Sequence, residues 1–231
     1  MEEKKTIQFK KEEFSAREYL KKTIGKGKVS RVRIEYTPVG EKVIISTHKP
    51  GLIIGRGGEK INELTKTLKD NFDLQNPHVE IDEIKQPEFD AQLIADEIAM
   101  GMEKFGPMKF KVLAYKSLEK IMKAGALGAE IRLSGKLPSA RARSWRFSQG
   151  YLKKTGESAD VVDRAQARAE TRPGTVGIKV SILPPNVRLK DKISLNEEVI
   201  NKLKERASSD LDALEDNKKS KKKKTKKKSK K

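Results

Sequence analysis

Apolar residues along residues 1–86 repeat with the period of a helix and then with that of strands. A stripe with spacings of three and four residues predicts a helix over 12–24. Alternation of apolar and polar residues predicts three strands, over 31–36, 43–48 and 78–84. Between the last two strands, Pro50 begins a short helical turn, and a longer helix follows whose apolar face holds Ile61, Leu64, Leu68 and Phe72. We predict that this face packs on the hairpin of the first two strands.

A second pattern begins after the hinge Lys85-Gln86-Pro87. Proline followed by acids is a typical helix start, and two amphipathic helices are predicted, over 87–105 and 108–124. Four segments with strand periodicity follow, over 129–136, 143–149, 161–171 and 175–183. In the third, alanines alternate with polar side chains and a Pro-Gly turn leads into the fourth, so we predict a hairpin despite the helix propensity of alanine. The fold class is therefore predicted as α+β, with two helices on a four-stranded antiparallel sheet in this part.

The density of apolar residues falls after residue 185. A capping box from Ser194 to Glu197 predicts one further helix over 194–203, and residues 218–231 hold eleven lysines and no acid, which predicts a disordered tail. We expect two domains, an acidic and amphipathic extension and the tail, over 1–86, 87–185, 186–217 and 218–231.

The composition of the 231 residues narrows the class of partner. A net charge of +19 indicates a polyanion, and residues 1–217 still carry +8 once the eleven tail lysines are subtracted. There are no cysteines and only two isolated histidines, so we expect no metal site and no cofactor. No stretch reaches the ~20 apolar residues of a membrane span, and the first ten residues lack the apolar core of a signal peptide. We expect a cytoplasmic protein with no membrane partner and no small-molecule substrate.

The segment from Gly51 to Ile61, GLIIGRGGEKI, interrupts an apolar run with glycines and restarts as a helix. Glycine lacks the Cβ atom that would hold a phosphodiester at a distance, and the N-terminus of a helix favours an anion. The spacing is not that of a Walker loop, because Glu59 follows Gly58, nor that of the dinucleotide fingerprint, because Lys60 replaces its third glycine. What remains is Gly-x-x-Gly, beginning at Gly55, which resembles the loop by which KH domains clamp single-stranded nucleic acid.

We predict that this loop binds the RNA backbone together with the cations beside it. The candidate RNA-binding residues are Lys49, Gly55, Arg56, Gly57, Gly58 and Lys60. Ile53, Ile54 and Ile61 are predicted as an apolar floor for bases, with core packing as the alternative that we expect for two of the three. For the loop itself, the alternative is a plain glycine-rich turn.

A second basic segment covers residues 132–154, which contain no acid and interleave cations with aromatic side chains. Within it, residues 136–143 directly follow Gly135, include Pro138 and are predicted as an exposed loop that threads between RNA strands. Trp145 and Phe147 share a strand face and are expected in the core. The candidate RNA-binding residues are Arg132, Lys136, Arg141, Arg143 and Arg146.

Four segments make the sequence similar to one protein family. They are GLIIGRGGEKI from Gly51, PEFDAQLIADEIAMGMEKFG from Pro87, LGAEIRLSGKL from Leu127 and GTVGIKVSILPP from Gly174. Together they resemble the universal ribosomal protein S three family of the small subunit, in its archaeal form, over residues 7–185. The resemblance implies a type II KH domain followed by a second α+β domain. It also implies binding to small-subunit rRNA in the head of the subunit, near neighbouring head proteins and the channel where mRNA enters.

The resemblance also concerns the helix over 108–124. In bacterial members this helix carries a cluster of cations that is credited with unwinding mRNA. Lys111 and Lys116 match that cluster, whereas Val112 and Tyr115 replace cations. We include Lys111 and Lys116 among the candidate RNA-binding residues, with simple solvation of the helix as the alternative.

Two other functions remain open at this point. One is a nucleic-acid-processing enzyme that nicks damaged DNA or acts on it as a lyase, and the other is a free KH-type regulator of mRNA. The acids do not gather near the basic segment, so we expect no enzyme.

Overall fold

The computed structural model describes residues 2–37, 40–72, 74, 76–138, 140–187 and 189. Residues 1–187 form one compact unit. The helix predicted over 194–203 and the lysine-rich tail lie outside the described residues. Within the described ranges, no helix combines the length and the apolar character that crossing a membrane requires.

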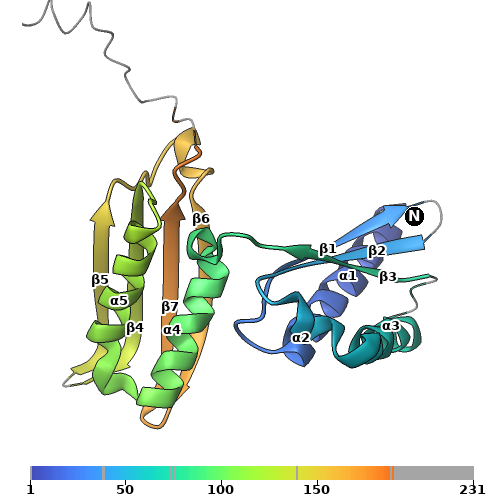
Figure 1. Cartoon of the computed structure of the whole chain (residues 1–231), viewed down its shortest axis with the longest axis horizontal. Helices are drawn as coiled ribbons and strands as arrows, with labels where there is room; N and C mark the ends of the chain where they lie inside the picture. Colours follow the sequence, from blue (N-terminus) through green and yellow to red (C-terminus); the bar gives the residue numbers. More distant parts are fainter. Residues whose placement is uncertain are drawn as a thin grey trace, which may run out of the picture. The chain divides into compact units, whose positions relative to one another are not determined.

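The elements from α1 to β3 form what we call the N-terminal module, and they follow the predicted order (Figure 1). Their bounds are α1 Glu2–Ile24, β1 Val29–Thr37, β2 Gly40–Thr47, α2 Pro50–Ile54, α3 Glu59–Phe72 and β3 His78–Glu83. Strands β1 and β2 pair antiparallel and β2 and β3 pair parallel, which gives the order β1-β2-β3. A parallel neighbour needs a crossover connection, and α2 and α3 provide it.

Helix α1 begins well before the predicted start at residue 12. Its first turns are exposed and carry no apolar stripe that reaches the core, so the periodicity did not reveal them. Lysine, glutamate and glutamine are good helix formers, and Glu13 pairs with Lys10 and Arg17 one turn away on either side. Propensity and local ion pairs thus extend the helix beyond its buried part.

The core of the N-terminal module lies between its helices and one face of its sheet. Alternate strand residues face inward, among them Val32, Ile34, Val43 and Ile45. The helices contribute Ala16, Leu20 and Ile24 from α1 and Leu64 and Leu68 from α3. The predicted packing of α3 on the hairpin is confirmed.

The elements from α4 to β7 form the C-terminal module. Their bounds are α4 Ala91–Phe105, α5 Phe110–Lys123, β4 Gly128–Leu137, β5 Ala140–Gly150, β6 Asp163–Thr171 and β7 Gly174–Leu183. The strands form an antiparallel sheet in the order β5-β4-β7-β6, and Figure 1 shows α4 and α5 on one face of it. The predicted fold class, including the alanine-rich hairpin of β6 and β7, is confirmed.

Both helices of this module begin later than predicted. Residues Pro87–Phe89 form a 3-10 turn, and Asp90 caps α4 by accepting from the N–H groups of Gln92 at 2.9 Å and Leu93 at 3.1 Å. Residues Pro107–Lys109 form a similar turn before α5. In each case proline starts a tight turn that precedes the α-helix itself.

The prediction of an exposed loop over residues 136–143 is wrong. Strand β4 runs through Leu137 and β5 starts at Ala140, so the two strands form a tight hairpin. Leu137 is only 2% exposed, and its burial carries the strand past Gly135. Gly135 sits next to a register shift, where a Cβ atom would lie 2.7 Å from the Thr175 carbonyl oxygen. The glycine therefore marks a bulge with a close neighbour and not the start of a loop.

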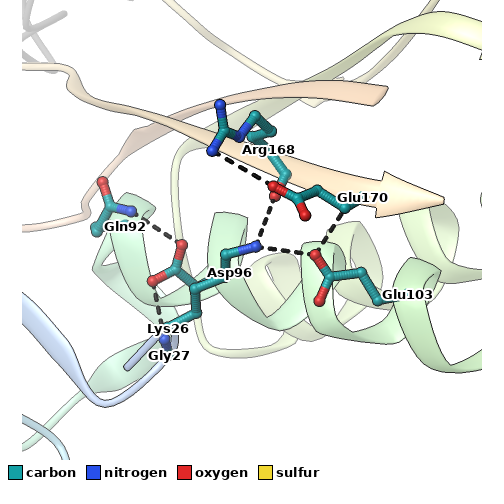
Figure 2. A network of polar contacts seen from close by, with 7 residues as sticks. All are labelled: Lys26, Gly27, Gln92, Asp96, Glu103, Arg168 and Glu170. Atoms are coloured by element: carbon teal, nitrogen blue, oxygen red, sulfur yellow. Dashed lines mark hydrogen bonds and ion pairs between the residues drawn. The ribbon is translucent and has the colours of Figure 1, made fainter. Parts of the chain in front are cut away.

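A network of polar contacts, which we call the polar bridge, joins the segment after α1 to the C-terminal module (Figure 2). It comprises Lys26, Gly27, Gln92, Asp96, Glu103, Arg168 and Glu170. The Lys26 ammonium donates to Glu103 Oε1 at 2.9 Å and to the Arg168 carbonyl at 3.2 Å. The Glu170 N–H donates to the same Glu103 oxygen at 3.0 Å. Because β6 is an edge strand, these backbone groups have no ladder partner on that side, and the bridge satisfies them.

Further contacts reinforce the polar bridge from β1. The Ser30 hydroxyl donates to Asp90, and Arg31 pairs with Asp163. Asp163 also accepts the Ala91 N–H at 2.9 Å, at the start of α4. Carboxylates of α4 and β6 thus hold donors that come from the N-terminal module.

Asp96 is the buried carboxylate of the polar bridge. The residue is 8% exposed, and its side chain accepts from the Gly27 N–H at 2.9 Å and from Gln92 Nε2 at 3.1 Å. Burial raises the pKa of Asp96 above 3.8, against the opposing effect of these hydrogen bonds. Protonation of Asp96 therefore favours the folded state. This contribution is present below the unfolded-state pKa and is lost as the pH rises through the folded-state pKa.

Replacing Asp96 tests how much the polar bridge stabilises the fold. At pH 7, we expect Asp96→Ala to lower the free energy of unfolding by about 1–3 kcal/mol, because the partly buried Gly27 N–H loses its acceptor. Asp96→Asn keeps an acceptor oxygen and removes a desolvated charge, so its stability stays closer to that of the parent. Urea unfolding followed by circular dichroism compares the three chains. Equal midpoints for the parent and Asp96→Ala would contradict this role.

Candidate nucleic-acid interface

The glycine loop, residues Gly55–Gly58, joins the end of α2 to the start of α3. Gly55 has φ 74° and ψ −175°, and Arg56–Gly58 form a 3-10 turn that leads into Glu59. Gly57 has φ 60° and ψ 18°, which is the left-handed region that glycine adopts without strain. The chain is therefore kinked here, and α3 starts with its N-terminal end at the loop.

The glycines of the loop serve different purposes. A Cβ atom at Gly55 would lie 2.8 Å from Cγ of Lys60, so this glycine makes room for the stem of that lysine. A Cβ atom at Gly57 would meet no protein atom within 4 Å. Packing thus explains Gly55, whereas Gly57 is exposed and leaves its backbone open to an approaching partner.

The cations predicted beside the loop are all exposed. They are Lys49, Arg56 and Lys60, and none of them forms an ion pair with another described residue. The Lys49 N–H donates to the Thr47 hydroxyl at 3.1 Å, which fixes the corner between β2 and α2. Three positive charges, unpaired among the described residues, therefore lie at a loop in which three of the four residues are glycines.

The isoleucines near the loop divide as expected between core and surface. Ile53 is 1% exposed and Ile61 is half-buried against the same core, whereas Ile54 is 39% exposed. Leu52, which the sequence did not single out, is 46% exposed and lines a cavity of about 210 Å³ between α1, α2 and α3. The apolar surface beside the loop thus consists mainly of Leu52 and Ile54.

Strand alternation divides the basic segment 132–154 between two faces of the C-terminal sheet. Arg132 and Arg146 stand directly opposite each other in the β4–β5 register, on the face that the helices leave open. Arg143 lies on the helix-covered face, where its Cζ is 4.7 Å from the centre of the Trp145 ring. Lys111 of α5 lies 4.6 Å from the same ring. Two of the predicted cations therefore meet on an indole, at a distance typical of cation–π contacts.

The remaining candidates lie apart from these groups. Lys116 lines a groove of about 710 Å³ between α4 and α5, in which Lys120 pairs with Glu97 at 3.1 Å. Lys136 is exposed near Gly174 at the hairpin end. Arg141 belongs to β5, and its side chain lies outside the described part of the structure. Trp145 is half-buried and Phe147 is 4% exposed, which confirms their expected place in the core.

The open face of the C-terminal sheet gathers more cations than the sequence singled out. We call it the basic sheet face and define it by Arg132, Arg146, Arg164, Arg168 and Lys179. Lys179 stands opposite Arg132 in the β4–β7 register, and Arg164 and Arg168 come from β6. The alternation of β6 and β7 already placed these cations on one face, but only the strand order brings them next to Arg132.

One buried acid, Glu130, lies within the basic sheet face. The residue is 7% exposed; it accepts from Arg132 at 3.1 Å and pairs with Lys154 at 2.5 Å. Burial opposes its ionisation, yet the hydrogen bonds from Lys154 and Arg132 outweigh this and hold the pKa of Glu130 below 4.5. Glu130 is therefore a carboxylate at neutral pH, held between two cations.

Comparison with known proteins bears on both modules. Residues 15–89 match the model of the KH domain, and residues 98–182 match that of ribosomal protein S3, C-terminal domain. A similar protein is the small ribosomal subunit protein uS3 of Methanosphaera stadtmanae, 40% identical over 78% of this chain and 71% of the relative. The protein of the same name in Methanocaldococcus jannaschii is 39% identical over 78% and 86% of the two chains. The matched KH segment contains the whole glycine loop.

A charge reversal in the glycine loop tests its part in binding. We expect the double change Arg56→Asp and Gly57→Asp to weaken binding of short single-stranded RNA at least tenfold, or about 1.4 kcal/mol. The reason is that two carboxylates then occupy the place of a phosphate. Fluorescence anisotropy on the full chain measures the affinity, with circular dichroism to check folding.

The matched control for this experiment lies on the exposed side of α3. Lys66→Asp with Asn71→Asp changes the net charge by the same three units and leaves the loop intact. If both double variants lose the same affinity, the loop acts only through net charge, and a folded loop variant with parental affinity would mean that the loop is a plain turn.

Proposed function

Because the chain belongs to the family of the small ribosomal subunit protein uS3, we propose that it is a structural constituent of the small ribosomal subunit that binds ribosomal RNA. The observation that carries this proposal is the extent of the match. Relatives of that name align with about four fifths of the chain, 78% in the first two, and the two matched models cover both modules in order. A KH module that acted alone as an mRNA regulator would not account for the second domain, which matches the ribosomal protein model.

The two modules support RNA binding through different chemistry. In the N-terminal module, we propose that the glycine loop receives a single-stranded backbone, with Lys49, Arg56 and Lys60 as phosphate partners. In the C-terminal module, Arg132 and Arg146 present guanidinium forks side by side on a rigid sheet, an arrangement suited to phosphates. Binding, and not catalysis, is the activity that we assign to these residues.

The position of the protein within the subunit is the finer part of the proposal. We place it in the head, beside the channel where mRNA enters, in the cytoplasm. Helix α5 supports contact with a neighbouring head protein, because Met108, just before it, and Val112 and Tyr115 on it are 77%, 65% and 59% exposed. Apolar side chains at that exposure are typical of a surface that a protein partner covers. Lys111 and Lys116 flank this patch and remain available to RNA.

Co-sedimentation tests the assignment to the small subunit. A tagged full chain expressed in an archaeal host is expected to sediment with small subunits in a sucrose gradient and to stay with them at moderate salt. The control is an unrelated tagged protein of equal net charge, which separates specific incorporation from attraction to RNA. A chain found only in the soluble top fractions would contradict the proposed function.

Paired substitutions test whether cations on the sheet contribute more than cations of the lysine-rich segment. We expect Arg132→Ala with Arg146→Ala to reduce incorporation into small subunits more than Lys230→Ala with Lys231→Ala. Both pairs remove two charges, but the sheet holds Arg132 and Arg146 side by side, which reduces the entropy that they lose on binding. The amount of tagged chain in the small-subunit fraction gives the result. Equal losses would indicate that only total charge matters.

A further inference from the structure

The two sheets of this protein each have one face without helices, and these faces differ in charge. In the N-terminal module cations and acids alternate across the open face, with Arg31, Arg33, Glu35, Lys42, Glu80 and Asp82. On the basic sheet face, Arg146, Arg132 and Lys179 form one row across β5, β4 and β7. Among the described sheet residues of this face, the only acids are Glu130 and Glu170. The second face thus has a surplus of positive charge that the first lacks.

Part of the basic sheet face is hollowed into a cavity of about 260 Å³. Its lining contains Glu130, Arg132, Lys154, Arg164, Lys179 and Ser181. Arg164 lies opposite Ser181 and diagonal to Lys179 across β6 and β7, and neither cation forms an ion pair with a described residue. Several cations therefore converge on one space, and a single carboxylate is available to neutralise them.

Glu130 is the only acid in the cavity lining, and its position explains the arrangement of the cations. It lies in the same cross-strand row as Ser181 and Arg164, one row from Arg132 and Lys179. Its two oxygens engage Arg132 and Lys154, which fixes two flexible side chains at the cavity wall. The Arg132 guanidinium has five N–H donors, so it can contact Glu130 and still donate to another acceptor.

We propose that this cavity binds a phosphate group of RNA through Arg132, Lys154, Arg164 and Lys179, and that Glu130 is the positioning residue that sets two of these cations for it. The inference rests on the proposed function, since it names the RNA backbone as the ligand of the C-terminal module. The lining favours a phosphate over an acidic peptide because its cations and hydroxyl suit phosphate oxygens. For the apolar parts of a peptide it offers only Leu152.

Removal of the Glu130 charge separates positioning from simple attraction. Glu130→Gln raises the net charge by one, so diffuse attraction alone predicts tighter binding of RNA. Positioning predicts the opposite, because Arg132 and Lys154 lose the carboxylate that orders them. We expect an affinity at least about fivefold weaker than that of the parent, for an RNA hairpin of mixed sequence bound to the full chain.

The matched control is the other carboxylate of the same face. Glu170 is 62% exposed at its side chain and pairs with Arg168 at 3.4 Å, outside the cavity. Glu170→Gln makes the same change in net charge, and we expect equal or slightly tighter binding. If Glu130→Gln and Glu170→Gln both tighten binding, total charge governs the face, and the proposal is overturned.

The salt dependence of binding provides a readout that loss of stability alone does not move. Losing one phosphate contact is expected to reduce the slope of log K against log salt by about 0.7 to 0.9. We expect this reduction for Glu130→Gln despite its higher net charge, and for Arg164→Ala and Lys179→Ala. The last two remove side chains that form no ion pair with a described residue, so they test the cavity if Glu130→Gln fails to fold. Parental affinity and slope in both would overturn the proposal.

A second probe distinguishes RNA from protein as the ligand. A polyglutamate peptide of the same charge as the hairpin is titrated against the same variants. If Glu130→Gln and Arg164→Ala weaken peptide binding as much as RNA binding, the cavity accepts acidic segments in general, and the RNA assignment fails. Co-sedimentation of the parent chain with small subunits is scored separately. A failure there with these RNA effects intact would reject the proposed function and keep the phosphate site.

Discussion

Each module of this protein consists of two layers, a sheet and the helices that cover one of its faces. The constraint that shapes everything else is that the other face has no apolar cover and must therefore be polar. Alternation along the strands meets this requirement by placing isoleucine, valine and alanine on one side and charged residues on the other. In the N-terminal module the charges balance across the open face. In the C-terminal module positive charge is in surplus, and we propose that this open face binds RNA.

The two RNA-binding surfaces that we propose differ in what the chain contributes. The glycine loop offers backbone, since Gly57 in a left-handed conformation presents no side chain to keep a partner away. The basic sheet face offers side chains on a rigid platform, ordered by the register of four strands and by the buried carboxylate of Glu130. The first suits a flexible single strand, which adapts to the loop, and the second suits RNA that is already structured.

The sequence predicted the elements well because apolar periodicity reports directly on burial, even for the alanine-rich strand β6. The sequence-based prediction failed where one residue type occurs in two kinds of structure. Gly135 and Pro138 indicated a loop, but Gly135 serves a bulge in a strand that the buried Leu137 continues. The grouping of Arg132, Arg143 and Arg146 as one basic segment was also too coarse, because odd and even positions of a strand face opposite sides. Arg164 and Lys179 were missed, since only strand order brings β6 and β7 beside β4.

The polar bridge affects the β6 edge of the protein even when no RNA is bound. An unpaired edge strand is a template for pairing with other chains, and a newly made chain with no RNA partner is exposed to that risk. Lys26 and Glu103 bond two outward backbone groups of β6, the Arg168 carbonyl and the Glu170 N–H, so the protein itself covers this part of the edge. At the opposite edge, β5 carries Arg143 and Arg146, whose repulsion disfavours stacking of identical chains. The cations that we propose for RNA binding would thus also oppose self-aggregation of the free protein.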